Sequence, residues 1–407
     1  MNECKKSGLW RCQRQNRGLV STVAVFGVVI VVSILAYLSF GNKSKAEPSL
    51  RFLSIIHRHG ERNPIMTFPS DPYSNESIFW PEGYGQITKE GIVTMYELGK
   101  SLRARYDGFI PSRYMVSDLQ VLSSRHDRMI MSSQALLAGL YPPIGNQIWN
   151  PDLQWQPIPV HTLEEPIDTV RKELLSTMFG LSKPCPRLQR ETKHVLDAND
   201  KKFFSDHQEL IDFVQKKTGI NVNSAVDVGG LYNYLQTLDR RGLPLPEWSR
   251  SIYPDALESI ALIWISCHTD TTTLKRLFSG VLINDMVTNM KMKRNSEKEF
   301  GRLLNQYSAS DIDIMSLWRS LGVKQQVPIV DFGGTFIIEL HEIRNKYRVK
   351  ILYKKHGLDK EWDVLNINGC EEDSYQDNMC DFEVFLTALK SVLDVDFDKE
   401  CQIENYG

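Results

Sequence analysis

The feature that most constrains the fold is a short apolar run that ends in a basic, glycine-containing loop. Residues 52–56 read FLSII and are followed closely by RHGERNP at residues 58–64. The apolar run predicts a buried strand, and Gly60 allows the backbone to turn tightly after it. Open α/β sheets bind their ligands where parallel strands end. The loop therefore occupies the position in which such a fold would hold a ligand.

The residue types of this loop point to anion chemistry. Arg58 and Arg62 flank His59, and a guanidinium stays charged and offers paired donors that match phosphate oxygens. Positive charges beside an imidazole oppose its protonation, which keeps a ring nitrogen available as a nucleophile at acidic pH. An ordinary basic surface loop is the alternative interpretation. The preceding strand, Gly60 and Pro64 argue against it.

The order of strand, polar turn and helix recurs along the chain. The predicted strand and helix pairs are 52–56 with 89–106, 119–122 with 129–140, and 303–307 with 312–321. In the first helix Thr88 is the expected N-cap, and five residues mark the buried side: Ile92, Met95, Tyr96, Leu98 and Leu102.

The turns of these units carry Arg58 and His59, then Arg128, then Ser310 and Asp311. We expect them to share one crevice of a doubly wound, mostly parallel sheet. Each turn taken singly would more often be an ordinary connection, and the sequence does not itself demonstrate that the turns converge.

The remaining pattern predicts a second lobe and the end of the fold. From about 150 to 254 the sequence becomes helical and polar, which indicates an insertion that forms a helical cap. Segments 335–342 and 347–353 predict a hairpin on the outside of the sheet, and 380–393 a final helix.

The N-terminal region predicts a membrane anchor. Residues 18–42 carry no charge and are long enough to cross a bilayer, which needs about 20 apolar residues. A cleavable signal peptide has a shorter apolar core of roughly 7–15 residues, and late cleavage is the alternative. Basic residues are denser before this span than after it. The positive-inside rule then predicts a cytoplasmic tail at 1–17, a stalk at 43–49 and a domain at 50–401 that is lumenal or extracellular.

Composition narrows the class of partner and of site. A net charge of −2 gives no electrostatic reason to expect a nucleic-acid partner. The nine histidines show no spacing that suggests a zinc site. Asn75 begins an Asn-Glu-Ser glycosylation acceptor, which the predicted topology makes usable. The cysteines after the span number five, so at least one thiol stays free or pairs between chains: Cys185, Cys267, Cys370, Cys380 and Cys401.

Taken together, these residues resemble the histidine acid phosphatases, the branch of the histidine phosphatases that includes prostatic and lysosomal acid phosphatases. The similarity runs from about 50 to 401, and its most specific element is the loop at 58–64. Residues 80–88 (WPEGYGQIT), Asp127-Arg128 and residues 279–284 (SGVLIN) support it in the same order.

The resemblance implies an α/β sandwich of three layers with a helical cap, and hydrolysis of phosphate monoesters without a metal or cofactor. It implies that His59 accepts the phosphoryl group, that Asp311 protonates the leaving alcohol, and that three arginines hold the phosphate oxygens: Arg58, Arg62 and Arg128. Phosphoryl transfer depends mainly on positioning and charge stabilisation, which fixed cations supply. An acid that must keep its proton explains an acidic optimum.

One residue departs from the family pattern. Ser310 stands where the family has a histidine, which would give a phosphate oxygen one more donor. The serine hydroxyl is shorter and neutral, so it would need a bridging water or a shifted loop to reach the phosphate. Loss of one transition-state donor predicts a rate lower by a factor on the order of 10²–10³. An acid phosphatase of reduced activity is therefore the first hypothesis, and a catalytically impaired module that binds a phosphate ligand is the second.

The resemblance also implies two disulfides and an assembly. Cys185 would pair with Cys401 and Cys370 with Cys380, which leaves Cys267 as the unpaired thiol. A homodimer is usual among relatives, although the sequence identifies no interface. Lysosome, secretory pathway and cell surface are not distinguished.

Overall fold

The computed structural model describes residues 46–162, 185–263, 268–295, 300–370, 375–376 and 378–402. The predicted cytoplasmic tail, the predicted membrane span and Cys267 lie outside these residues. Within the described ranges no helix is both long enough and apolar enough to cross a bilayer.

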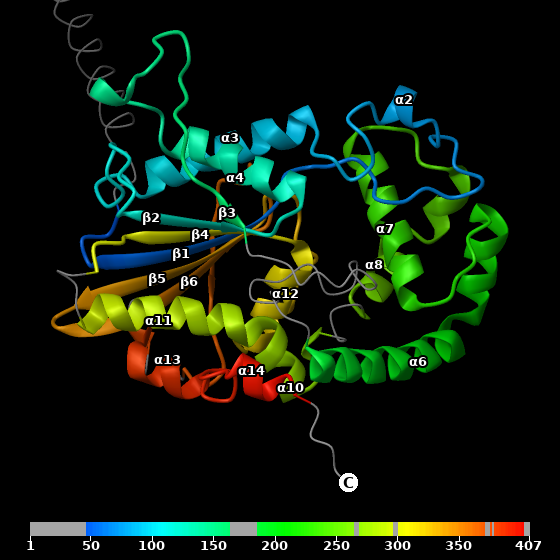
Figure 1. Ribbon diagram of the computed structural model, residues 1–407. Coiled ribbons are helices and arrows are strands. Elements are labelled where there is room, and N and C mark those ends of the chain that lie inside the picture. Colours follow the sequence, from blue (N-terminus) through cyan, green and yellow to red (C-terminus); the bar gives the residue numbers. More distant parts are fainter. Residues whose placement is uncertain are drawn as a thin grey trace, which may run out of the picture.

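A nine-stranded sheet forms the centre of the described part of the chain (Figure 1). Its order is β3-β2-β4-β1-β5-β6-β9-β8, and β7 pairs with β6 off this path. The strands are β1 (Leu50–Arg58), β2 (Leu119–Ser123), β3 (His161–Thr162), β4 (Leu304–Ala309), β5 (Thr335–Ile343), β6 (Lys346–Lys354), β7 (Asp363–Leu365), β8 (Tyr375–Gln376) and β9 (Met379–Asp381).

The sheet is mixed, so the prediction of a mostly parallel sheet is wrong. Strands β1 to β4 pair in parallel, whereas every pair that involves β5 to β9 is antiparallel. The predicted hairpin is confirmed as β5 and β6, but it does not lie outside the sheet, because β5 pairs with β1 and β6 pairs with β7 and β9. Its two-residue turn, Arg344 and Asn345, has positive φ at both positions, and so short a connection joins only antiparallel strands.

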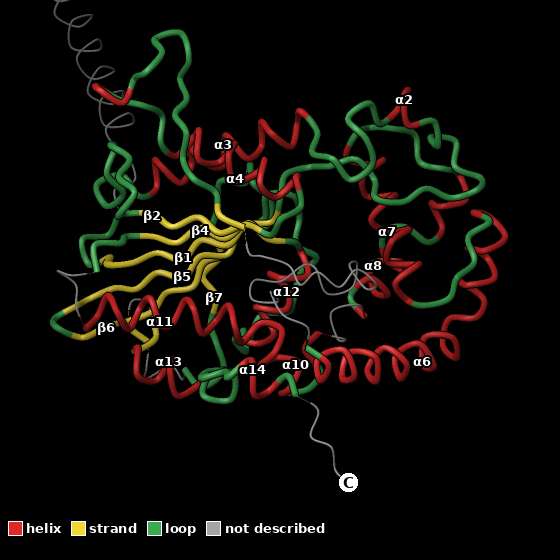
Figure 2. The backbone as a smooth tube through the Cα atoms, in the orientation of Figure 1, coloured by secondary structure: helices red, strands yellow, loops and turns green. Residues whose placement is uncertain are grey.

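Helices cover both faces of the sheet and form a separate lobe beside it (Figures 1 and 2). The helices are α2 (Glu76–Phe79), α3 (Lys89–Arg105), α4 (Asp127–Leu140), α6 (Pro186–Thr218), α7 (Ala225–Arg240), α8 (Asp255–Ala261), α10 (Thr272–Lys275), α11 (Val281–Asn295), α12 (Asp311–Ser320), α13 (Phe382–Ala388) and α14 (Phe397–Glu400). Short turns of 3₁₀ or π helix are η1 (Gly145–Gln147), η2 (Glu247–Ser251) and η3 (Arg276–Gly280). The predicted units are confirmed as β1 with α3, β2 with α4, and β4 with α12.

Alternation along β1 divides the core into two layers. Leu53 and Ile55 face the cluster that contains α3 and α4, whereas Phe52 and Ile56 face the cluster that contains α11, α12 and α13. Successive side chains of a strand point to opposite faces, so β1 is apolar on both sides. This two-sided burial explains why its sequence reads as a continuous apolar run.

The first predicted helix is confirmed with one error about its faces. The hydroxyl oxygen of Thr88 caps α3 by accepting a hydrogen bond from the Gly91 N–H at 3.0 Å. Three of the expected core residues are fully buried: Met95, Leu98 and Leu102. Ile92 and Tyr96 are each 39% exposed, so their predicted burial is wrong.

Two glycines explain this error. A Cβ at Gly99 of α3 would lie 2.0 Å from the Leu136 carbonyl oxygen of α4, and a Cβ at Gly139 of α4 would lie 2.1 Å from the Tyr96 carbonyl oxygen of α3. The two backbones therefore meet where side chains are absent. The contact between α3 and α4 is therefore determined by glycines, whereas the prediction counted only the spacing of apolar side chains. Ile92 lies outside this contact and remains partly exposed.

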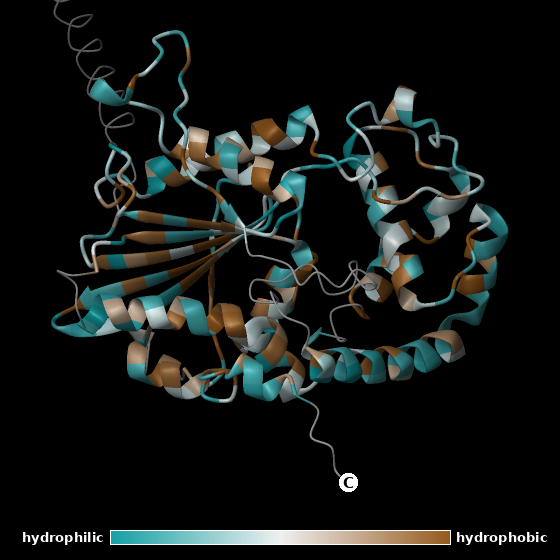
Figure 3. Ribbon diagram, viewed as in Figure 1, coloured by the Kyte–Doolittle hydropathy of each residue, from teal (hydrophilic) through white to brown (hydrophobic). Residues whose placement is uncertain are grey.

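The second lobe consists of α6, α7, α8 and the loop that contains α2, and it lies to the right in Figure 1. Its core joins Leu231 and Leu235 of α7 to Phe68 and Trp80, which precede α3 in the sequence. Hydrophilic residues dominate the outer helix α6 (Figure 3). Strand β3 lies within residues 150–254, which were expected to form the cap. It belongs to the sheet instead, because it pairs with β2.

The C-terminal region ends in two short helices instead of the single predicted one. Helix α13 ends at Ala388, and α14 follows after a turn. Arg276 donates hydrogen bonds to the carbonyl oxygens of Ser391 at 3.1 Å and Leu393 at 2.9 Å. In a continuing helix these carbonyl oxygens would accept from backbone N–H groups of the helix itself. Both disulfides implied by the family resemblance are present, Cys185–Cys401 and Cys370–Cys380.

Candidate active site

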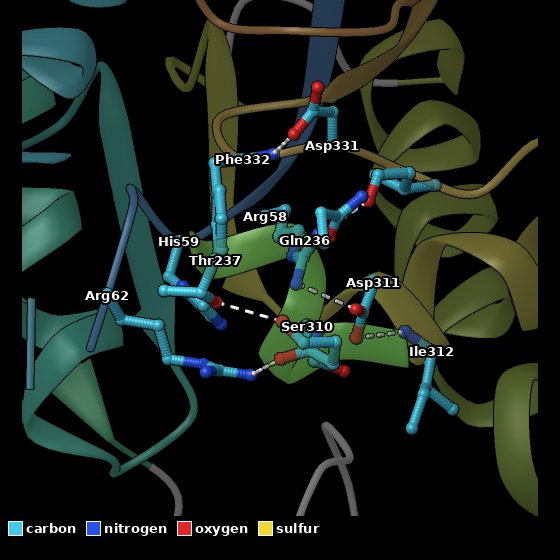
Figure 4. A network of polar contacts seen from close by, with 12 residues as sticks. Arg58, His59, Arg62, Gln236, Thr237, Ser310, Asp311, Ile312, Asp331 and Phe332 are labelled. Carbon is cyan, nitrogen blue, oxygen red and sulfur yellow. Dashed lines mark hydrogen bonds and ion pairs between the residues drawn. The ribbon is translucent and has the colours of Figure 1, made fainter. Parts of the chain in front are cut away.

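The three polar turns leave the sheet at one edge. Arg58 at the end of β1 pairs in register with Ala309 at the end of β4. Ser308 of β4 pairs in turn with Ser123 at the end of β2. Because these strands are parallel neighbours, the segments that follow them begin side by side. Their expected convergence is therefore confirmed, and Figure 4 shows the side chains of the first and third turns facing one another.

His59 is held in one orientation and one tautomer. Its side chain is buried, and Nδ1 lies 2.8 Å from the Gly60 carbonyl oxygen. A carbonyl oxygen only accepts, so Nδ1 carries the hydrogen and the lone pair of the neutral ring is on Nε2. The His59 backbone N–H donates to the Ala309 carbonyl oxygen at 3.2 Å, which fixes the loop against β4.

The surroundings of His59 keep it neutral. Burial holds the pKa of its imidazole well below the usual value, and the positive charges of Arg128, Arg58 and Arg62 lower it further. The hydrogen bond to Gly60 acts weakly in the opposite direction. The sequence indicated the effect of the arginines, and burial adds a larger one. The Nε2 lone pair is thus available in acidic solution.

The side chain of Arg58 is held in place by contacts with three residues. Its side chain is fully buried, and Nη1 donates to the Val330 carbonyl oxygen at 2.6 Å. Its guanidinium carbon lies 4.3 Å from the centre of the Phe332 ring. Nη2 forms an ion pair with Asp311 Oδ2 at 2.9 Å. The arginine therefore links the first turn to the third.

Arg62 and Arg128 complete a cluster of positive charge. Arg62 donates from Nη1 to the Asn63 carbonyl oxygen at 3.0 Å and from Nη2 to Asn233 Oδ1 at 2.6 Å. Burial, with help from Arg58 and Arg128, lowers the pKa of Arg62 to about 9. Burial also lowers the pKa of Arg128, in the first turn of α4. Among the described residues, the one ion pair made by these three guanidinium groups is that of Arg58 with Asp311, so the cluster has a surplus of positive charge that suits a dianion.

Asp311 is the first residue of α12 and remains reachable from solvent. Its Oδ1 accepts a hydrogen bond from the Ile312 N–H at 2.9 Å, and its side chain is 26% exposed. With Oδ2 on Arg58, the carboxyl group lies across the site from His59 (Figure 4). This position allows it to exchange a proton with a group bound between them.

Ser310 is the N-cap of α12, and its hydroxyl is already engaged. The hydroxyl donates to Asp313 Oδ2 at 2.7 Å, and the Ser310 backbone N–H donates to the same oxygen at 2.7 Å. The Asp313 N–H donates in return to Ser310 Oγ at 3.3 Å. Sequence reasoning missed Asp313, although Ser-x-x-Asp before an apolar run is the readable signature of this capping box.

Helix α7 of the second lobe reaches the first turn, which the sequence did not predict. Asn233 accepts from Arg62, as described above, and Arg241 donates to Asn63 Oδ1 at 2.9 Å just beyond the end of the helix. Arg240 forms an ion pair with Asp331. Gln236 and Thr237 of the same helix are among the residues of the polar network drawn in Figure 4. These partners are separated by 91 to 178 residues, so no local pattern reveals them.

Asn75 lies outside this site. It is exposed and directly precedes α2. Its side-chain oxygen accepts a hydrogen bond from the Ser77 hydroxyl at 2.8 Å. The acceptor is accessible, and its glycosylation stays a prediction.

Comparisons with known proteins agree with the resemblance noted in the sequence. The family model described as "Histidine phosphatase superfamily (branch 2)" matches residues 49–354. Lysosomal acid phosphatase of Rattus norvegicus is 33% identical over 364 residues, which cover 87% of this chain and 81% of the relative. Prostatic acid phosphatase of Bos taurus is 30% identical over 401 residues, which cover 96% of this chain and 98% of the relative.

Solved structures show the same fold at low sequence identity. The apo form of Hafnia alvei phytase matches with a TM-score of 0.61 and 15% identity, covering 87% of this chain and 98% of the phytase. Citrobacter braakii phytase matches with a TM-score of 0.60 and 17% identity, covering 87% and 100%. These likenesses support the architecture of sheet and helices.

Proposed function

The chain is a phosphatase of branch 2 of the histidine phosphatase superfamily, and from this premise we propose that it hydrolyses phosphate monoesters through a phosphohistidine on His59. The observation that carries the proposal is the neutral imidazole with its Nδ1 hydrogen on the Gly60 carbonyl oxygen and three guanidinium groups around it. A nucleophile and a set of fixed cations are what phosphoryl transfer requires.

In the first step, Nε2 of His59 attacks phosphorus while the bond from phosphorus to the ester oxygen breaks. Arg58, Arg62 and Arg128 stabilise the charge on the phosphoryl oxygens, and Asp311 donates its proton to the leaving oxygen. In the second step, water attacks the phosphohistidine and transfers a proton to Asp311. The N–P bond breaks, inorganic phosphate leaves, and His59 and Asp311 return to their starting states.

We propose that this turnover is slower than the full set of donors would permit. The Ser310 hydroxyl donates to Asp313, so in this conformation it is not available to a phosphate oxygen. The expected loss is a factor on the order of 10²–10³ for one absent transition-state donor. Ser310 thus belongs to the site as the cap of the helix that carries Asp311, and its predicted contact with phosphate would require the hydroxyl to turn away from Asp313.

The same observation favours a second candidate function. If the missing donor abolishes turnover, the buried cations remain able to hold an oxyanion, and the domain acts as a module that binds phosphate ligands. This candidate predicts binding of phosphate or vanadate by the purified protein without hydrolysis.

The test compares the purified wild-type protein with His59→Ala and with His194→Ala, a substitution of an exposed histidine on α6. An aryl phosphate is supplied at mildly acidic pH, and acid-labile phosphorus on the protein is measured after a rapid quench with ³²P-labelled substrate. We expect turnover and labelling in the wild type and in His194→Ala, and neither in His59→Ala. Equal rates for His59→Ala and wild type would remove the phosphohistidine. Vanadate binding without turnover in the wild type would establish the second candidate.

We also propose that the domain faces a lumen or the cell exterior and is anchored by residues 18–42. The two disulfides support an oxidising compartment, and the exposed Asn75 is compatible with glycosylation there. The names of the lysosomal and prostatic relatives point to the same side of the membrane. The homodimer implied by the resemblance stays a prediction.

A further inference from the structure

A second carboxyl group lies two residues beyond Asp311 and has no part in the steps above. The side chain of Asp313 is buried, and its Oδ2 accepts two hydrogen bonds from Ser310, one from the backbone N–H and one from the hydroxyl. Its Oδ1 is also buried and has no hydrogen-bond partner within the described residues. Within the described residues, the carboxyl group of Asp313 therefore forms hydrogen bonds with Ser310 alone.

A buried carboxyl group is a costly cap for a helix. Burial raises the pKa of Asp313 to about 7, and the negative charge of Asp311 acts in the same direction, whereas the two bonds from Ser310 oppose it. The chain uses the same Ser-x-x-Asp box at the start of α7, where Asp227 is only half-buried. An exposed carboxyl or a neutral acceptor would cap α12 at lower cost. Groups retained at such a cost are often found at functional sites.

The box determines where helix α12 begins. Asp313 holds the Ser310 backbone in an extended conformation, and the helix starts with the next residue, Asp311. The direction of the Asp311 side chain follows from that start. It places Oδ1 on the Ile312 N–H and Oδ2 on Arg58. Without the box the first turn of the helix would fray, and both contacts would loosen.

We propose that Asp313 is the positioning residue for the general acid: through its bonds to Ser310 it holds Asp311 in the orientation that protonates the leaving oxygen. The inference rests on the proposed role of Asp311. It assigns the effect of Asp313 to one step, the protonation of the leaving group. It also predicts that Ser310→His alone restores little activity, because Asp313 would draw the new imidazole toward the start of the helix.

The experiment uses the dependence of rate on the leaving group. A general acid matters most when the leaving alkoxide is strongly basic and least when it is a stable phenolate. The second-order constant kcat/KM, which reports the phosphorylation step, is measured with alkyl phosphates, phenyl phosphate and nitrophenyl phosphates. The full-length proteins are the wild type, Asp313→Ala, Asp313→Asn, Asp311→Asn and the matched capping-box control Asp227→Ala.

For Asp313→Ala we expect a loss of roughly 10- to 100-fold with alkyl phosphates, part of the 10²–10⁴ range typical of general acid catalysis, and little loss with dinitrophenyl phosphate. Asp313→Asn keeps an oxygen that accepts from Ser310, so it should restore most of the alkyl phosphate activity. Asp227→Ala should lower thermal stability without changing the dependence on the leaving group.

The outcomes separate this inference from the function on which it rests. An equal loss with every substrate in Asp313→Ala, no loss at all, or an Asp313→Asn protein as impaired as the alanine variant would overturn the positioning role. If Asp311→Asn keeps the wild-type dependence on the leaving group, the acid assignment itself is wrong. Should Asp313→Ala fail to fold, Ser310→Ala must show the same selective loss in smaller measure, because it removes the two hydrogen bonds between the Ser310 hydroxyl and Asp313 and keeps the one from the Ser310 backbone N–H.

Discussion

At the scale of single residues, two histidines near the end of β1 are kept neutral by their surroundings. Burial alone lowers the pKa of His57 to about 4, whereas burial and three arginines act together on His59. His57 accepts a hydrogen bond from Gln306 at 3.0 Å and donates to the Arg58 carbonyl oxygen at 3.3 Å, so it supports the strand beneath the site.

The pKa of His57 predicts how stability changes with pH. In the unfolded chain its pKa returns to the usual value of 6.5, so on acidification the unfolded state takes up this proton first. The contribution is complete above about pH 6.5 and is lost progressively between pH 6.5 and 4. Over that interval the free energy of unfolding falls by on the order of 3 kcal/mol from this group.

Replacement of His57 by glutamine removes this titration. We therefore expect the free energy of unfolding of His57→Gln, measured by urea denaturation at a series of pH values, to fall less steeply between pH 6.5 and 4 than that of the wild type. His194→Gln, at an exposed position, should keep the wild-type slope. If the free energy of unfolding fell equally steeply with pH in the wild type and in His57→Gln, the result would contradict the lowered pKa of His57.

Residue chemistry was the part of the site most readable in the sequence. Arg58, His59 and Arg62 form one local motif, and Arg128 and Asp311 each lie in the polar turn that follows a predicted strand. The side-chain direction of Ser310 was not predicted, although the Ser-x-x-Asp spacing to Asp313 is a local signature of the hydrogen bond that sets it.

At the scale of elements, α3 and α4 meet through glycine. Periodicity located both helices, because apolar spacing reports which segments are helical. It misjudged Ile92 and Tyr96, because it gives no weight to Gly99 and Gly139, whose absent side chains set the contact. The hairpin β5–β6 was likewise located correctly and placed wrongly, since strand order depends on partners distant in the sequence.

A methyl group at this contact should destabilise the fold. In Gly139→Ala the new Cβ would approach the Tyr96 carbonyl oxygen to 2.1 Å and the Lys100 nitrogen to 2.9 Å, so the helix backbones must move apart. We expect the free energy of unfolding to fall by about 2 kcal/mol, the usual scale of overpacking. Gly301→Ala is the control, because a Cβ there meets no atom within 4 Å. An equal effect of the two substitutions on the urea midpoint would argue against the close contact.

At the scale of the whole molecule, the second lobe supports residues of the proposed phosphate site. Asn233 fixes Arg62, Arg241 fixes Asn63, and Arg240 pairs with Asp331 next to Phe332. None of these pairs is local in the sequence, and each requires both lobes to be folded. Sequence patterns describe single elements, so they predicted that a cap exists and gave no indication of what it touches.

Loss of one of these contacts should weaken anion binding. In Asn233→Ala, Nη2 of Arg62 loses an acceptor at 2.6 Å, and the guanidinium gains freedom to turn. A hydrogen bond to a charged group contributes roughly 1.5–3 kcal/mol, so we expect the inhibition constant for vanadate to rise about 10-fold. Asn221→Ala, at an exposed position of the same lobe, should leave it unchanged. An unaltered inhibition constant in Asn233→Ala would show that Arg62 needs no support from the cap.

The bond between Cys185 and Cys401 encloses most of the second lobe and much of the sheet, because its cysteines are 216 residues apart. A protease that nicks the chain anywhere between them leaves both pieces joined by sulfur. Such a clipped molecule would run as an intact band on a gel without reductant and divide only when a thiol is added.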